Sequence, residues 1–297
     1  MKLDEFLRLN APEELATLTL AVAKASITVW DNIPFKSGLL AEVNPSGDTQ
    51  KAIDVFSNEV FVETLTSTGC AAEIASEEMA EPTQAKGTIS VAMDPLDGSS
   101  NVETNNPVGS IFGFYSKKLP TSGRNLAGSL YVTYGNMMTI TLSFGKGVHR
   151  FVAVREGAGM NFELLGVNLR LPEKPEVYGI GGSKKDWTPS VSRFVDSLEE
   201  RGLRVRYCGT FVGDYNQVLA RGGMFAYPQM KNRPKGKLRI LYETAPISFL
   251  NEQAGGYASD GRQNILDLAP SELLETSPAY IGSAPLVREL EKTVSEG

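Results

Sequence analysis

The feature that most constrains the fold is a change in the spacing of apolar residues along the chain. Before about residue 65 the apolar residues recur at helical intervals, within residues 3–7, within residues 12–30 and in a segment that begins near residue 48. Residues 88–93 then follow the alternating pattern that is typical of a strand. The chain is therefore predicted to begin with helices and to continue into a sheet.

The rest of the sequence predicts further strands and helices. Strands are expected at residues 72–75, 110–115, 128–134, 138–143, 149–155, 177–181 and 204–207. Helices are expected at residues 190–201, 214–221 and 246–255. A chain of 297 residues is at the size where one hydrophobic core stops growing. We therefore predict helices layered on two sheets, with an α+β domain at residues 1–165 and an α/β domain at residues 166–297.

Composition excludes several classes of protein. Apolar residues make up 41% and charged residues 22%, which excludes disordered and fibrous chains. A net charge of −6 argues against a nucleic acid or an anionic membrane as a partner. Two cysteines cannot form a disulfide framework, and His149 is the single histidine, so the chemistry is expected to use carboxylates, hydroxyls, amines and metal ions. Neither a signal-peptide pattern nor an apolar run of membrane-spanning length is present, so a cytoplasmic protein is expected.

Acidic residues are concentrated in four short segments that contain Asp48 and Asp54, Glu77 and Glu78, Asp94 and Asp97, and Glu243. Each segment alone has an ordinary explanation. The first and last are typical of charges near a helix start, the second of a solvated loop, and the third of a turn around Pro95. The four segments are therefore better considered together than singly.

The third segment is the most specific, because it combines cation ligands with a phosphate cradle. Hard cations such as Mg²⁺ prefer carboxylate and carbonyl oxygens, which Asp94, Asp97 and the Leu96 carbonyl offer within four residues. An anion is favoured by outward-pointing N–H groups at the start of a helix. Such groups are expected at Gly98, Ser99 and Ser100.

These acidic motifs resemble the Mg²⁺-dependent, lithium-sensitive sugar-phosphate phosphatases. Within that superfamily the chain is similar to the class I fructose-1,6-bisphosphatases, with sedoheptulose-1,7-bisphosphatases as close relatives. Inositol monophosphatases typically carry Trp-Asp where this chain has Tyr242-Glu243, which favours the bisphosphatase branch. The resemblance covers nearly the whole chain and implies an α-β-α-β-α layered sandwich. Its matching segments are residues 87–101, 108–115, 123–126 and 236–243.

The resemblance implies a reaction and a cofactor. The reaction is hydrolysis of the 1-phosphate of D-fructose 1,6-bisphosphate by metal-activated water, giving fructose 6-phosphate and phosphate, a step of gluconeogenesis. Two or three Mg²⁺ ions, for which Mn²⁺ can substitute, are expected to bind Glu77, Asp94, Asp97, Glu243 and the Leu96 carbonyl. The residues expected to orient and deprotonate the attacking water are Asp48, Asp54 and Glu78.

A second group of residues resembles the family's site for the sugar and the distal phosphate. The residues expected there are Tyr207, Tyr227 and Lys237 on the 6-phosphate, Arg206 from a neighbouring subunit, and Thr210 and Phe211 along the sugar. The basic run 231–239, which ends at Arg239, belongs to the same resemblance, although alone it is also explained by a solvated loop or a nucleic-acid patch. Because Arg206 matches a residue that in the family comes from a neighbouring subunit, the resemblance implies a homo-oligomer, at least a dimer and a tetramer of two dimers as in the family.

Two segments depart from the family pattern. Residues 180–183 are Ile-Gly-Gly-Ser where the family has Asn-Glu-Gly-Tyr, so Ser183 alone offers a hydroxyl there and a seven-carbon bisphosphate stays an open alternative. Residues 10–15 lack the glycine-rich turn of the family's AMP site, and Lys86 is displaced from its position, so AMP is not expected to inhibit. An inositol-phosphate phosphatase and a non-catalytic sugar-phosphate binder are less favoured, because they leave Glu243 or the intact acids unexplained.

Overall fold

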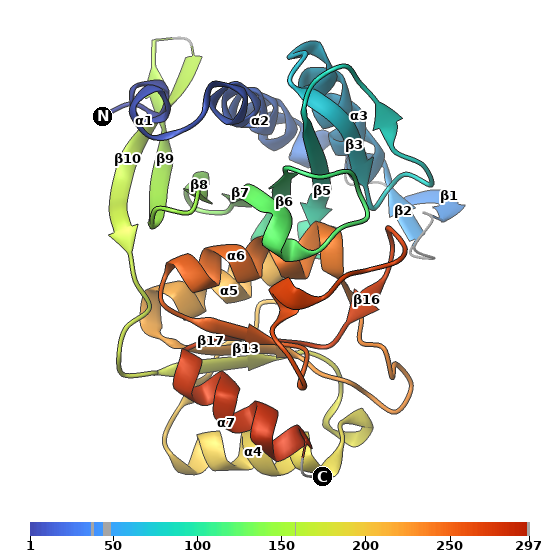
Figure 1. Ribbon diagram of the computed structural model, residues 1–297, viewed down its shortest axis with the longest axis vertical. Coiled ribbons are helices and arrows are strands. Elements are labelled where there is room, and N and C mark those ends of the chain that lie inside the picture. The colour runs from blue at the N-terminus through green and yellow to red at the C-terminus, as the bar shows by residue number, and fades with distance from the viewer. Residues whose placement is uncertain (37–38, 44–48, 158, 296–297) are drawn as a thin grey trace.

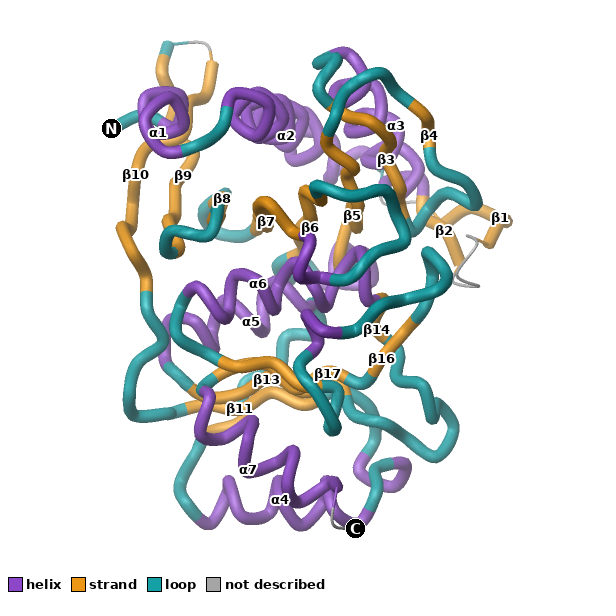
Figure 2. Tube along the Cα trace, in the orientation of Figure 1, coloured by secondary structure: helices purple, strands orange, loops and turns teal. Residues whose placement is uncertain are grey.

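The helices and sheets of the computed structural model, which describes residues 1–36, 39–43, 49–157 and 159–295, are stacked in five layers (Figures 1 and 2). One outer layer contains α1, α2 and α3, which cover an eight-stranded sheet. Helices α5 and α6 lie between that sheet and a five-stranded sheet, and α4 and α7 cover the far face of the smaller sheet. The predicted α-β-α-β-α sandwich is confirmed. The helices are α1 (Leu3–Asn10), α2 (Glu13–Asn32), α3 (Ala52–Ser67), α4 (Pro189–Glu200), α5 (Phe211–Arg221), α6 (Ala245–Gln253) and α7 (Ala284–Ser295).

The larger sheet has the strand order β10-β9-β8-β7-β6-β5-β3-β4, and it is antiparallel except for the parallel pair β3 and β5. Its strands are β3 (Ala71–Ser76), β4 (Thr83–Gln84), β5 (Ile89–Asp97), β6 (Val108–Tyr115), β7 (Leu126–Tyr134), β8 (Thr139–Ser143), β9 (Val148–Glu156) and β10 (Gly159–Leu169).

The smaller sheet has the order β12-β11-β13-β17-β15, with parallel pairing of β11 to both β12 and β13. Two further two-stranded sheets pair β1 with β2 and β14 with β16. The strands outside the larger sheet are β1 (Leu39–Val43), β2 (Thr49–Lys51), β11 (Val177–Ile180), β12 (Arg204–Val205), β13 (Gly223–Tyr227), β14 (Leu238–Arg239), β15 (Tyr257–Ser259), β16 (Thr276–Ser277) and β17 (Ala279–Gly282).

The helical spacing of the N-terminal segments produces the first layer. Pro12 precedes α2, and Glu13 and Glu14 in the first turn complement the helix dipole. The apolar face of α2 is buried against the larger sheet and α3. Phe61 of α3 meets Phe112 of β6 edge to face, with ring centroids 4.9 Å apart. This layer fixes the position of α3 above β5, and both elements carry site residues.

The structure corrects several of the predicted element bounds. Helix α3 begins at Ala52, because residues 49–51 form the short strand β2. Strand β5 does not stop before Asp94 but continues to Asp97, with a shift in its register to β6 between these two residues. Strand β10 was not predicted.

The predicted boundary between residues 165 and 166 falls inside β10, and the chain passes from the larger to the smaller sheet after Leu169. The division into two domains stays a prediction. Among the described residues, no helix combines the length and the apolar character that crossing a membrane requires.

Candidate active site

A cavity of about 340 Å³ lies where β5, the end of β13, the start of α5 and the turn before α6 converge. Most of the predicted site residues line it, although they come from distant parts of the chain. These residues are Asp54, Glu77, Glu78, Asp94, Leu96, Asp97, Gly98, Ser99, Ser100, Tyr207, Thr210, Phe211, Tyr227, Lys237, Arg239 and Glu243.

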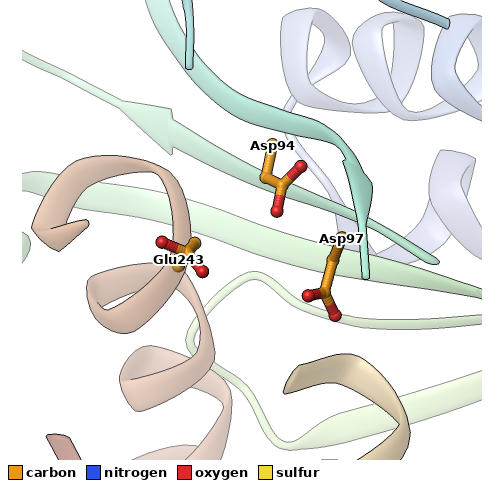
Figure 3. Close-up of side chains that lie close together, drawn as sticks. All are labelled: Asp94, Asp97 and Glu243. Atoms are coloured by element: carbon orange, nitrogen blue, oxygen red, sulfur yellow. The ribbon is translucent and has the colours of Figure 1, made fainter. Parts of the chain in front are cut away.

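Three buried carboxylates form the centre of this cavity. Asp94, Asp97 and Glu243 each place one oxygen so that the three oxygens lie within 4.8 Å of one another. Figure 3 shows that the three side chains face a common space, two from β5 and one from the π-helical turn η5 (Ile240–Thr244). The cluster joins residues of the larger sheet to the segment that leads into α6.

The backbone of β5 sets the direction of its two aspartates. Pro95 has no N–H group to donate to the neighbouring strand. Its carbonyl accepts a hydrogen bond from the Ser110 hydroxyl at 2.8 Å. The Leu96 N–H donates to Asp94 Oδ1 at 3.0 Å, and the Val212 N–H of α5 donates to Asp97 Oδ2 at 2.7 Å. The irregular end of β5 therefore turns both carboxylates toward the cavity and connects one of them to α5.

Arg239 lies beside two of the acids, Glu77 and Glu243. Its guanidinium lies 3.0 Å from Glu77 and 3.6 Å from Glu243, and its backbone N–H donates to Glu243 Oε2 at 2.6 Å. Its single positive charge does not balance the surrounding carboxylates. Arg239 was predicted within the distal-phosphate segment, whereas the structure places it beside the carboxylate cluster.

Burial raises the pKa values of these acids, because the charged form loses its hydration. Burial and the neighbouring acids raise the pKa of Asp94 and of Glu77 well above the ordinary range. Burial also raises the pKa of Glu243, and it raises that of Asp97 to about 7 although backbone N–H groups stabilise the charged form. Asp94, Asp97, Glu77 and Glu243 are therefore unfavourable to hold in the charged form all at once.

The donor set fits a hard divalent cation. It offers only oxygen atoms, from Asp94, Asp97 and Glu243, and Glu77 and Leu96 line the same cavity. Mg²⁺, Mn²⁺ and Ca²⁺ take oxygen ligands of this kind, whereas structural zinc favours sulfur and nitrogen. A bound divalent cation would stabilise the charged forms of these acids, which burial disfavours.

Asp54 lies at the rim of the cluster, in the first turn of α3. Its Oδ2 accepts from the Lys51 N–H at 2.8 Å and from the Ser99 hydroxyl at 3.4 Å. Burial and the nearby Glu78 raise its pKa to about 6, against the lowering effect of these hydrogen bonds. The carboxylate is therefore positioned to exchange a proton near neutral pH. Asp48, predicted beside it, lies outside the described residues.

Part of the cavity lining is aromatic and basic. Tyr207, Phe211 and Tyr227 line it, and the Lys237 ammonium lies 5.5 Å from the centre of the Tyr227 ring. Two predicted residues, Ser183 and Arg206, are exposed and are not part of this lining.

Sequence reasoning missed five residues that line the cavity: Lys51, Gly209, Asp214, Phe225 and Leu238. The buried Lys51 ammonium pairs with Glu103 at 2.6 Å and donates to the Ser99 carbonyl at 3.2 Å. The sequence offers only one weak indication that Lys51 and Asp214 belong to the site, namely that they lie close to predicted site residues. Lys51 is three residues before Asp54, and Asp214 is four residues after Thr210.

Gly98 is required for close packing between the β5 end and α5. It has a φ of +75°, and a Cβ atom there would overlap the methyl group of Thr210. We expect Gly98→Ala to lower the free energy of unfolding by about 2–4 kcal/mol, combining overpacking with the cost of a left-handed residue. Urea denaturation followed by circular dichroism measures the change.

Gly69→Ala is the matched control, because Gly69 has a φ of +70° but no atom within 4 Å of its Cβ position. Only the backbone cost of about 1–2 kcal/mol is expected there. Equal losses in the two variants would contradict the packing argument.

Comparisons with known proteins agree over both parts of the chain. The family models described as the N-terminal and C-terminal domains of fructose-1-6-bisphosphatase match residues 7–160 and 171–295. A class 1 fructose-1,6-bisphosphatase of Halobacterium salinarum is 38% identical over 279 residues, which cover 93% of this chain and 96% of that protein. Another of Geobacter metallireducens is 39% identical over 287 residues, which cover 94% and 90%. The structure of Leishmania major fructose-1,6-bisphosphatase in holo form is 30% identical, with a TM-score of 0.93 over 100% of this chain and 99% of that one.

Proposed function

The chain belongs to the class 1 fructose-1,6-bisphosphatase family and hydrolyses fructose 1,6-bisphosphate to fructose 6-phosphate and phosphate, and we propose that the cavity between the two sheets is where it does so. One observation carries the proposal. The buried cluster of Asp94, Asp97 and Glu243 shares a single cavity with Tyr227 and Lys237. The lining of one cavity thus combines cation ligands with a cationic, aromatic surface.

We assign the 1-phosphate to the acidic end. Glu77, Asp94, Asp97, Glu243 and the Leu96 carbonyl would hold two or three Mg²⁺ ions, for which Mn²⁺ can substitute. When bound, these ions supply positive charge that lowers the pKa of water and stabilises the phosphoryl and leaving oxygens.

The protein's own groups then position the substrate and move a proton. Asp54, with a pKa of about 6, is suited to accept a proton from the attacking water, and Glu78 lies beside it. Asp48 belongs to this assignment by its place in the sequence. Backbone N–H groups from residue 98 to residue 100 lie where β5 turns into the 3₁₀-helix η2 (Ser99–Thr104), and we assign them to the phosphate oxygens.

We assign the sugar and the distal phosphate to the other end. Thr210 and Phe211 would contact the sugar, while Tyr207, Tyr227 and Lys237 would contact the 6-phosphate. Ser183, which is exposed and outside the lining, is not favoured as a phosphate contact in this arrangement.

Substrate turnover tests the proposal. The purified protein is assayed for phosphate release from fructose 1,6-bisphosphate and from sedoheptulose 1,7-bisphosphate, with Mg²⁺ and with a chelator. We expect Mg²⁺-dependent turnover of the fructose bisphosphate with a higher kcat/KM than that of the heptulose. A large preference for sedoheptulose 1,7-bisphosphate would make that compound the substrate in place of fructose 1,6-bisphosphate. Turnover that persists in the chelator would contradict the assignment of the carboxylates as metal ligands.

Arg206 provides a test of assembly. It is exposed and not part of the lining of its own cavity, which suits a residue that reaches a neighbour's distal phosphate. We therefore propose a symmetric homo-oligomer, a tetramer as in the family. Arg206→Ala is expected to raise KM about tenfold with kcat within about twofold, because the contact is remote from the reacting phosphorus.

The control is Arg204→Ala, which removes another exposed arginine, one whose guanidinium lies 2.9 Å from Glu176. It should leave KM unchanged. Light scattering gives the oligomeric state, and a fully active monomer would contradict the shared site.

A further inference from the structure

The loop of residues 206–210, between β12 and α5, is held by side chains that have no assigned role in the reaction. The Cys208 N–H donates to Asp214 Oδ1 at 2.7 Å, and the Gly209 N–H donates to Asp214 Oδ2 at 3.3 Å. From the other side, Asn101 Nδ2 donates to the Cys208 carbonyl at 2.7 Å. Both backbone polar groups of Cys208 are therefore held by side chains, the N–H by Asp214 and the carbonyl by Asn101.

Asp214 is placed in an unusual environment for a carboxylate. It is only 2% exposed, it lies in the first turn of α5, and it lines the cavity. Burial raises its pKa to about 6, and the Cys208 and Gly209 groups oppose that rise. Burying a carboxylate costs free energy, so its oxygens need partners, and here the loop backbone provides them.

The held loop carries side chains of the distal end. Tyr207 and Thr210 both line the cavity, and Gly209, with a φ of +85°, allows the chain to turn between them. The loop is continuous with α5, whose Val212 N–H donates to Asp97 at 2.7 Å. A shift of the loop would therefore move Tyr207 and Thr210, whereas the hydrogen bond to Asp97 comes from α5 itself.

We propose that Asp214 is a positioning residue that holds residues 207–209 in place for the distal phosphate, and so determines the preference for a bisphosphate over a 1-monophosphate. This inference rests on the proposed function of the same cavity. Asp214 acts through the loop backbone. An asparagine at this position keeps one acceptor but directs its NH₂ group toward the second N–H, so the loop has to move.

The test is Asp214→Asn, assayed on fructose 1,6-bisphosphate and on fructose 1-phosphate. For the bisphosphate we expect KM to rise about tenfold with kcat within about threefold, which is about 1.4 kcal/mol of binding. The inhibition constant of the product fructose 6-phosphate, which carries the distal phosphate, should rise by a similar factor. The KM for fructose 1-phosphate should change less than threefold.

Asp260→Asn is the matched control, because Asp260 Oδ1 also accepts two backbone N–H groups, from Arg262 and Gln263 at 2.8 Å each, and Asp260 does not line the cavity. It should leave all three constants unchanged. If Asp214→Asn does not fold, Asn101→Ala removes the hydrogen bond on the other side of the Cys208 peptide unit and should give the same pattern.

Equal losses on the two substrates, or no change on either, would overturn the role of Asp214 and leave the proposed function in place. A wild-type protein that does not hydrolyse fructose 1,6-bisphosphate would instead contradict the proposed function itself.

Discussion

Replacing Asp94 or Asp97 by asparagine is expected to lower kcat at least about a thousandfold, which corresponds to about 4 kcal/mol of activation free energy. Each substitution removes a negative charge from the buried cluster with Glu243, while the amide oxygen can still accept from the Leu96 or Val212 N–H. Phosphate release at saturating substrate and Mg²⁺ measures the change.

The same variants should keep the fold. In a chelator their free energy of unfolding should equal or exceed that of the wild type, because a carboxyl group whose charged form is disfavoured by burial is replaced by a neutral amide. Asp196→Asn is the control, since Asp196 is exposed and its carboxylate is 2.6 Å from Lys184 in a surface ion pair. Turnover within about tenfold of the wild type for either cluster variant would contradict the assignment.

The metal-free protein is expected to lose stability as the pH rises from about 4 to about 7. Asp54 has a pKa of about 6 and Asp97 a pKa of about 7 in the folded protein, whereas an unfolded aspartate has a pKa of about 3.9. Between these values the folded state binds more protons at these two groups than the unfolded state, so their contribution to stability is fully present below about pH 4 and is lost as the pH rises. The loss for Asp97 alone is of the order of 4 kcal/mol.

Urea denaturation in a chelator, at intervals across this pH range, measures the effect of these two groups, with Asp97→Asn as the comparison whose curve should be flatter. Added Mg²⁺ should restore about 2.7 kcal/mol at pH 8 when its concentration is a hundredfold above its dissociation constant. If the slope is absent in the wild type, or is the same in Asp97→Asn, the raised pKa values do not describe the site.

The type and order of most elements could be predicted from sequence, because a strand or helix with one buried face repeats apolar residues at a period set by its own geometry. The alternation before Asp94 and the helical spacing within residues 12–30 are of this kind. Strand β10 was not predicted because two large apolar side chains lie on its solvent-exposed face. Leu165 and Val167 are 53% and 61% exposed, and they interrupt the alternation of apolar and polar residues that identifies a strand.

Local chemistry also identified the pair Asp94 and Asp97, since both ligands lie on one short segment whose spacing is covalently fixed. Resemblance added the more distant acids. The spacing of residues along the chain does not give the distance between Glu243 and this pair. That distance depends on how η5 packs against β5.

Only the tertiary structure decided which neighbours each charge has. It placed Arg239 between Glu77 and Glu243, and it paired Asp214 with the backbone of the loop before α5. The period of apolar residues in a helix or strand shows which face of the element is buried. The reason is that the free energy gained by burying apolar surface depends on the area buried and not on the direction of any contact. A hydrogen bond or a carboxylate cluster requires particular atoms at particular distances, and those distances are set by the packing of segments that the sequence keeps far apart.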